Sequence, residues 1–430
     1  MKLRYTLLLA GSLFSAAPGF AAETPDPINQ RISRLEAEIA ELKALIKSSP
    51  AAAPAPAAPT VSTASGTKLQ LYGFARFDAS YDSGQIYPGN IALYARPRSG
   101  GKSDGEWNLT AGATRLGLNL SGPDTPNMKL TGNIEMDFLG GGTENNSNPR
   151  LRHGYLKAYW PASDLSLVAG QTWDLVAPQM PFVDDAGLMW DAGNIGSRHP
   201  QLRLTKGVPA GERGRMELAI AASRTIGETN ATTGITATDP GKDAAMPTIQ
   251  GRVAWSGPVL VGSQPATIGI SGHYGQEEWD SNNTGSHKTL DSWSCAVDLL
   301  LPVCNKLTLA GEYFTGTNLD DYFGGAGQGV NAATIASPKA IRAHGGWAAL
   351  KVTVNADTAI SLGAGIDDPN DSDLSAPTAR TKNQSIFGML TNKISSNMTL
   401  GIQLGQWRTN YLNNDEGNAL RAQSSLTYKF

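Results

Sequence analysis

The sequence predicts an all-β protein, an antiparallel transmembrane β-barrel of about 16 strands preceded by a short N-terminal coiled-coil helix. Three observations lead to this fold class. The chain begins like an exported protein, and its last residues form a strand with one apolar face and one polar face. Between them, short alternating segments are joined by connections that are long and short in turn. Together these features indicate a closed sheet of amphipathic strands outside the cytoplasm.

Residues 1–21 have the layout of a secretory signal peptide. Two basic residues, Lys2 and Arg4, precede an apolar run over 7–14, and small residues stand at Gly19 and Ala21. After this segment, no stretch approaches the roughly 18 uninterrupted apolar residues that a membrane helix needs. The mature chain is therefore expected to be soluble in the periplasm, secreted, or a barrel in the outer membrane.

The sequence over residues 26–47 predicts a periplasmic coiled coil. Asp26 suits the helix N-cap and Pro27 the first helical position. The two core positions of the heptad are filled by Ile32, Ile39 and Ile46 and by Ile28, Leu35 and Leu42. Flanking charges favour parallel pairing with a neighbouring helix, and a lone amphipathic helix lying on a domain is the alternative. Because about three heptads are marginal alone, the coil should accompany a larger oligomer.

A Pro/Ala-rich linker over 48–66 separates the coil from the predicted barrel domain, residues 67–430. The 430 residues include 48 Gly and 17% charged residues, against roughly 7% Gly and 25% charged residues in average proteins. Abundant Gly suits turns and strongly curved strands. A net charge of -3 argues against a nucleic-acid partner, which would require a basic surface.

The barrel region divides into about 16 alternating segments of about ten residues, the length that a tilted strand needs to cross a bilayer. The segments are 69–82, 113–122, 128–139, 150–160, 165–173, 199–206, 214–224, 247–257, 265–276, 289–301, 305–315, 342–354, 358–367, 382–394, 397–408 and 417–430. Long connections over 83–112, 174–197, 225–246 and 316–340 are expected on one side, and short turns on the other. An even count places both ends of the domain on the short-turn, periplasmic side.

The final segment alternates strictly and ends on an aromatic residue. Leu420, Leu426, Tyr428 and Phe430 share one face, opposite a polar face that includes Arg421. This pattern resembles the C-terminal insertion signal of outer-membrane barrels. A terminal edge strand of a soluble sandwich is the alternative, and a propeller or solenoid is disfavoured because no repeat of about 20–50 residues is present.

Several arginines have the phase of lumen-facing positions. They are Arg76, Arg115, Arg203, Arg252 and Arg421. Three of them belong to the last, first and second strands, which become neighbours when the barrel closes, so a basic ladder on one wall is expected. The alternative for any single arginine is a pair with a nearby carboxylate such as Asp78 or Asp82.

The connection over 174–197 contains apolar anchors at Phe182, Leu188, Met189 and Trp190. It resembles the loop of trimeric sixteen-stranded porins that follows the fifth strand, folds into the lumen and narrows it. That resemblance implies that three acidic residues, Asp184, Asp185 and Asp191, oppose a basic wall. Opposed charges would create a transverse field that orients charged solutes. An external loop packed on the barrel rim is the alternative.

The whole mature chain resembles the DcaP-like porins in organisation. The likeness is sharpest at 71–78 (LYGFARFD), 170–174 (GQTWD) and 198–203 (RHPQLR). It implies a passive homotrimeric channel for small hydrophilic solutes that favours anions such as dicarboxylates, with Arg198 and Arg203 as constriction-wall cations. The heptad instead favours a coiled coil of two helices, so the sequence leaves open whether the protein is a dimer or a trimer. The acidic loop argues against a strong anion preference.

No enzymatic, metal or cofactor signature stands out. Nucleophile elbows and phosphate-binding loops are missing, and the five histidines lack ligand spacing. The favoured hypothesis is a diffusion pore in the cell outer membrane, in contact with lipid. The main alternative is a structural or adhesive barrel whose coil and linker tether it to the cell wall or to partners. A soluble exported glycan-binding protein is a third hypothesis.

Overall fold

The computed structural model describes residues 60–99, 104–143, 145–225, 244–259, 264–280, 287–331 and 337–430. The signal peptide expected over 1–21 and the coiled coil expected over 26–47 lie outside the described residues. Of the linker expected over 48–66, only the residues from Thr60 on are described, and the first three of them form a strand. Residues Thr60–Ser62 form a strand, β1, that pairs with the first long strand of the sheet.

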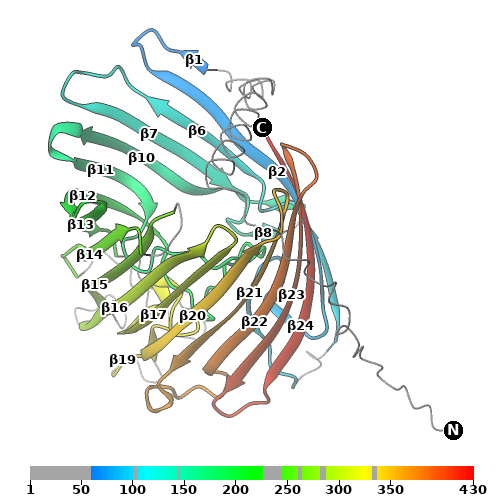
Figure 1. Ribbon diagram of the computed structural model, residues 1–430. Helices are drawn as coiled ribbons and strands as arrows, with labels where there is room; N and C mark the ends of the chain where they lie inside the picture. Colours follow the sequence, from blue (N-terminus) through cyan, green and yellow to red (C-terminus); the bar gives the residue numbers. More distant parts are fainter. Residues whose placement is uncertain are drawn as a thin grey trace, which may run out of the picture. The chain divides into compact units, whose positions relative to one another are not determined.

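One antiparallel sheet closes on itself as a barrel of 16 long strands (Figure 1). Its members are β1 (Thr60–Ser62), β2 (Lys68–Asp82), β5 (Glu106–Thr110), β6 (Arg115–Ser121), β7 (Lys129–Asp137), β10 (Arg150–Trp160), β11 (Leu165–Trp173), β12 (Arg198–Ala210), β13 (Gly214–Ser223), β14 (Thr248–Gly257), β15 (Ala266–Asp280), β16 (His287–Cys304), β17 (Leu307–Thr317), β20 (Arg342–Thr353), β21 (Thr358–Pro369), β22 (Arg380–Lys393), β23 (Met398–Tyr411) and β24 (Gly417–Lys429). The short β1 adds to the edge of β2, and β5 and β6 together form the second long strand. The predicted fold class is therefore confirmed for the barrel.

In their described residues, the connections between the long strands contain several small elements. These are the hairpins β3 (Ile86–Pro88) with β4 (Ala92–Ala95), β8 (Gly142–Thr143) with β9 (Asn146–Ser147), and β18 (Val330–Asn331) with β19 (Lys339–Ala340), and the 3-10 turns η3 (Asp320–Tyr322) and η4 (Asp371–Asp373). A further turn, η1 (Pro161–Ser163), joins β10 to β11. No helix among the described residues is long and apolar enough to span a membrane.

The first and last long strands close the barrel. Strand β24 pairs antiparallel with β2 from Lys429 opposite Phe74 to Arg421 opposite Asp82. The terminal residue continues this contact, since the Phe430 N–H donates to the Gly73 carbonyl at 3.2 Å. Closure leaves neither β2 nor β24 as an open edge, which explains why the amphipathic pattern can run to the C-terminus.

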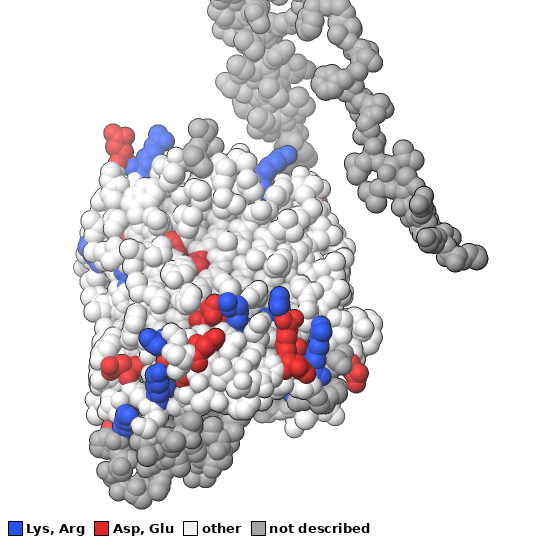
Figure 2. Space-filling view, turned by 90° about the horizontal axis from the view of Figure 1, so that it is seen from below, with Lys and Arg blue, Asp and Glu red and all other residues white. Residues whose placement is uncertain are grey.

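Side chains alternate between a polar inner face and an apolar outer face along the strands. On β7, Leu130 and Ile134 are exposed on the outside, whereas Glu135 and Asp137 are buried inside the barrel. Figure 2 shows one face of the molecule on which charged side chains are sparse over much of the wall and gather toward the lower edge. An uncharged belt of this kind suits a wall that contacts hydrocarbon.

The second long strand differs from the expectation. Residues 83–112 were expected to form a loop, but β5 lies within that range and pairs with the upper part of β2. The strand is interrupted between Thr110 and Arg115. There the Thr114 hydroxyl accepts from the Arg76 N–H and donates to the Arg76 carbonyl, so a side chain replaces the missing backbone pairing.

The apolar core lies inside the barrel, where the long connections pack against the wall. Hairpin β3–β4 buries Ile86, Ala92 and Ala95 against Trp407 of β23. A second cluster joins Val176 and Ile195 to other buried residues, Phe314, Leu319 and Tyr322. A barrel of this strand number is too wide for wall side chains alone to fill, so the connections supply much of the interior packing.

Candidate functional site

Segment 174–197, between β11 and β12, runs along the inner face of the barrel. Its backbone N–H groups donate to inward-facing side chains of four strands. The bonds are Leu175 to Gln250 of β14 at 2.8 Å, Ala177 to Ser271 of β15 at 3.1 Å, Gln179 to Glu312 of β17 at 2.7 Å, and Asp184 to Gln403 of β23 at 2.6 Å. Because these acceptors come from widely separated strands, the segment follows the inner wall over a long arc.

Apolar side chains attach the same segment to the wall. Met189 packs in a cluster with Trp347 of β20 and Phe387 of β22, and Phe182 lies against that cluster. The ring of Trp190 stacks on Phe323 with centroids 4.0 Å apart. Met189 and Phe182 therefore hold the segment against the wall, and Trp190 packs it against the connection that follows β17.

Acidic residues of the segment bind directly to the basic wall. Asp184 lies 3.3 Å from Arg76, whose Nη2 also donates to the Asp184 carbonyl at 2.7 Å. Asp185 lies 3.5 Å from Arg421 and accepts the Ala92 N–H of hairpin β3–β4 at 3.1 Å. Burial raises the pKa of Asp185, and Arg421 offsets this only in part. Asp184 and Asp185 thus lie opposite two arginines of the predicted basic wall, as expected, and they are in direct contact with them.

Both wall arginines also have a carboxylate on their own side of the barrel. Arg76 lies 2.5 Å from Asp78, and Arg421 lies 3.0 Å from Asp82. These are the two carboxylates that the sequence offered as alternative partners. Arg76 and Arg421 therefore anchor the segment 174–197 to the wall, and neither is a free cation.

Asp191 does not belong to this contact. Its backbone bonds to Phe323 and to the Asn383 side chain, away from Arg76 and Arg421. Burial raises its pKa to about 7, and the charge of Arg380 lowers it only partly. The expectation that Asp191 joins the acidic side of the constriction is therefore corrected.

Known structures share this architecture. The outer membrane channel DcaP of Acinetobacter baumannii matches with a TM-score of 0.69 at 20% identity, over 86% of this chain and 99% of that one. An anion-selective porin from Comamonas acidovorans matches with a TM-score of 0.54 at 13% identity, over 85% and 100% of the two chains. OprB of Pseudomonas putida matches with a TM-score of 0.52 at 11% identity, over 84% and 94%. The chain has the fold of a DcaP-like porin. No protein-family model and no curated protein matched its sequence.

Within this DcaP-like barrel, a cavity of about 150 Å³ lies between the basic wall and the segment 174–197. Its lining includes Phe74, Arg76, Arg115, Arg152, Asp184 and Leu188. Arg115 Nε lies 3.4 Å from Glu135, and its side chain is about one third exposed. Arg115 is thus the most accessible of the predicted cations at this cavity, and it contacts a carboxylate only loosely.

Three other predicted cations do not line this cavity. Arg198 is buried with its guanidinium 4.2 Å from the centre of the Trp173 ring. Arg203 donates to the Trp173 carbonyl and lines a second cavity of about 380 Å³, together with Lys157, Arg215 and Glu217. Arg252 pairs with Asp298 at 2.7 Å. Arg203 and Arg252 therefore lie in surroundings different from those of Arg115.

Two arginines of β10 join the basic wall although the sequence pattern did not indicate them. Arg152 lies 2.8 Å from both Glu135 and Asp137, and Arg150 lies 2.8 Å from Asp137. A β-bulge between Leu151 and His153 shifts the register, so residues on both sides of it point inward. Strict alternation counted back from Tyr155 places Arg152 on the lipid side, so the sequence pattern alone does not identify it as a lumen-facing residue.

The charged side chains of the lumen pair with one another and with segment 174–197. No group of three or more His, Cys, Asp or Glu among the described residues is arranged to hold a metal ion. The buried pair of His199 and Asp174, 2.8 Å apart, is tied to Gln250, which also bonds Ser223. This network joins the start of segment 174–197 to β12, β13 and β14, so its evident role is to anchor that segment.

Proposed function

We propose that the protein is an outer-membrane diffusion channel for small hydrophilic solutes, narrowed by the segment 174–197. One observation carries the proposal: this segment is bonded along the inner face of a closed barrel whose lumen is polar. A barrel with a purely structural role would not require inward-facing polar side chains from four strands to hold a loop inside. The matches to a channel and to porins support the same reading.

We infer that the channel favours small anions, with dicarboxylates as one class. Four arginines, Arg115, Arg150, Arg152 and Arg198, gather near two carboxylates, Glu135 and Asp137. Arg152 and Arg198 share the Trp173 ring, which links this group to β12. The excess positive charge would attract anions, and the planar guanidinium can bind a carboxylate through two parallel hydrogen bonds. The match to an anion-selective porin supports this preference.

We further infer that the short-turn end faces the periplasm and that the protein is a homotrimer. The apolar outer belt and the aromatic C-terminal strand support the outer membrane as the location. Light scattering of the purified protein in detergent should give three times the protomer mass. A monomer mass would exclude the trimer and leave the channel proposal intact.

Planar-bilayer recording tests the channel. Folded protein should give steady conductance, and a salt gradient should give a reversal potential on the anion side. The double variant Arg115→Gln/Arg203→Gln should move that potential toward cations, because both side chains line luminal cavities. The control Arg408→Gln, whose exposed side chain pairs with Glu416, should leave it unchanged.

Two outcomes contradict the proposal at different levels. An unchanged reversal potential in the double variant would remove the role of these arginines in selectivity. No conductance from folded wild-type protein would remove the channel itself and leave the tethering barrel as the explanation.

A further inference from the structure

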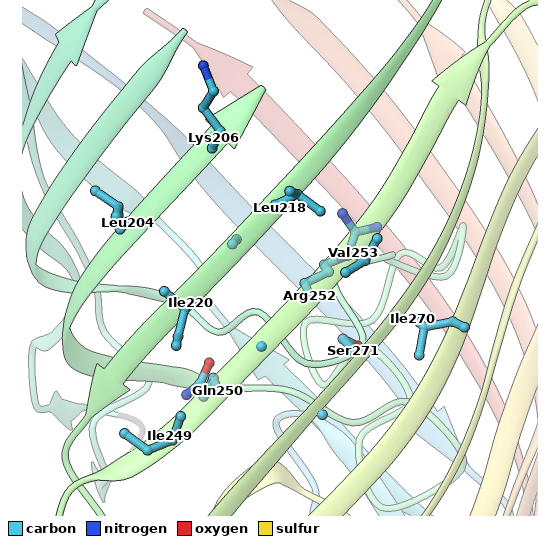
Figure 3. Close-up of a pocket in the computed structure, with 13 residues that line it drawn as sticks. Leu204, Lys206, Leu218, Ile220, Ile249, Gln250, Arg252, Val253, Ile270 and Ser271 are labelled. Atoms are coloured by element: carbon cyan, nitrogen blue, oxygen red, sulfur yellow. The ribbon is translucent and has the colours of Figure 1, made fainter. Parts of the chain in front are cut away.

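An apolar depression lies on the lipid-facing wall, across β12, β13, β14 and β15. Its volume of about 740 Å³ falls within the roughly 300–1,000 Å³ typical of ligand sites. Its rim consists of exposed aliphatic side chains that point outward, labelled in Figure 3: Leu204, Leu218, Ile220, Ile249, Val253 and Ile270. Gln250 and Ser271 also border it, but their side chains bond to segment 174–197 inside the barrel.

The strand register explains the depression. Gly251 of β14 stands directly opposite Gly272 of β15, so two neighbouring outward positions lack side chains. In the next row toward the short turns, Val253 stands opposite Ile270, and both side chains are present. A Cβ built on Gly251 would meet no atom within 4 Å. The wall is therefore hollow at this pair and apolar around it.

A cation stands at one end of the depression. Lys206 of β12 pairs with Leu218, points outward, and lies at the end opposite Ile249 (Figure 3). Its ammonium donates to the Ser163 carbonyl in the short turn between β10 and β11. Among the described residues, no carboxylate forms an ion pair with Lys206.

An aromatic residue lies one outward row nearer to the short turns than Lys206. Trp255 lies on β14 two residues beyond Val253, toward the short turns, and has the outward phase of Val253. Tryptophan is enriched at the membrane–water interface, and a lysine near that level extends its ammonium to the head groups. The depression therefore runs from head-group level into the hydrocarbon.

We propose that this groove binds a phospholipid of the inner leaflet, with one acyl chain in the depression and the phosphate at Lys206. The proposal rests on the orientation inferred above, in which the short turns face the periplasm. An acyl chain matches the apolar rim, and the phosphate complements the lysine. A second copy of this chain is a poorer match, because packing against it would desolvate Lys206, which has no carboxylate partner among the described residues.

Native mass spectrometry can test this with dioleoyl phosphatidylglycerol added to the full-length protein in mild detergent. The wild type should retain lipid adducts at collision energies that strip detergent. Gly251→Leu should abolish most of the adduct, because the new side chain fills the groove, and the open space at this position lets the variant fold. Lys206→Gln should lower the lipid occupancy of the groove about fivefold, because one contact between a basic side chain and a head group contributes roughly 1 kcal/mol.

A matched control exists on another part of the wall. Gly388 of β22 stands between the exposed Leu362 and Leu404, and its Cβ would meet only the flexible end of Leu362, at 3.2 Å. Gly388→Leu should therefore keep the adduct. A heat-modifiable gel band should confirm that every variant is folded.

The outcomes separate this proposal from the channel proposal. Equal adducts in wild type, Gly251→Leu and Lys206→Gln would overturn the lipid site. A change of oligomeric state in Gly251→Leu would also overturn it and would identify the groove as an interface between copies. Bilayer conductance should be unaltered in all three variants, so failure of the lipid site leaves the channel untouched. A wild type that binds lipid without conducting would instead overturn the channel alone.

Discussion

Replacing Arg421 with Gln should destabilise the barrel strongly, because its guanidinium joins three parts of the structure. The side chain is 2% exposed and lies 3.0 Å from Asp82 across the β2–β24 closure. It also lies 3.5 Å from Asp185 of segment 174–197 and donates to the Gly89 carbonyl at 2.9 Å. Its loss would leave two buried carboxylates without their cation.

The expected cost follows from that burial. Removing one partner of a buried ion pair costs about 3–5 kcal/mol, because the remaining charge is uncompensated. Arg408 on the neighbouring β23 offers a matched control. Its contact with Glu416 is 2.6 Å long, but both side chains are substantially exposed, at 53% and 34%. Such surface pairs contribute about 0–1 kcal/mol, so Arg408→Gln should change stability little.

Urea unfolding followed by tryptophan fluorescence in lipid vesicles measures both variants. Arg421→Gln should lower the transition midpoint well below that of Arg408→Gln. The double variant Asp82→Asn/Arg421→Gln should recover part of the loss, because one of the two uncompensated carboxylates is then neutral. Equal midpoints for Arg421→Gln and Arg408→Gln, or no recovery in the double variant, would refute the reasoning.

Two further predictions concern the segment 174–197. Gly193 has φ +107°, and a Cβ there would meet the Gly346 carbonyl oxygen at 2.2 Å. Gly193→Ala should therefore lower the free energy of unfolding by about 1–3 kcal/mol in the same urea assay. Unchanged stability would contradict the close packing. Burial raises the pKa of Asp191 to about 7, so its neutral form is favoured on folding. The wild type should lose stability as pH rises from about 4, the usual aspartate value, to about 7. Asp191→Asn should be less pH-dependent over that window, and identical profiles at pH 5 and pH 8 would contradict the assignment.

Much of the barrel wall follows from local pattern. Strands β10 and β11 begin and end where alternation predicted, at Arg150–Trp160 and Leu165–Trp173. A strand with one face toward lipid and one toward the lumen must alternate apolar and polar residues. This alternation therefore indicates both where a strand lies and which of its residues face inward. Pattern failed where a strand departs from this period, at the β-bulge before His153 and at the interruption before Arg115.

The candidate site was less predictable than the wall. The sequence indicated Arg76, Arg421, Asp184 and Asp185, but it did not indicate that they pair with one another. Such pairs join residues more than 100 positions apart, and no local pattern encodes which inward-facing side chain a loop will reach. The role of Arg152 was hidden for a second reason, because one extra residue in a strand reverses the phase of everything beyond it.

The sequence by itself determined that this chain forms a closed, lipid-facing barrel, because each strand must match a polar interior on one side and hydrocarbon on the other, and this requirement acts residue by residue. Only the tertiary structure decided how the interior is arranged: which acids neutralise which arginines, where the segment 174–197 lies, and where a pair of facing glycines hollows the outer wall. These features depend on contacts between distant segments, whose energies are set by the closed geometry of the barrel rather than by neighbours in the chain.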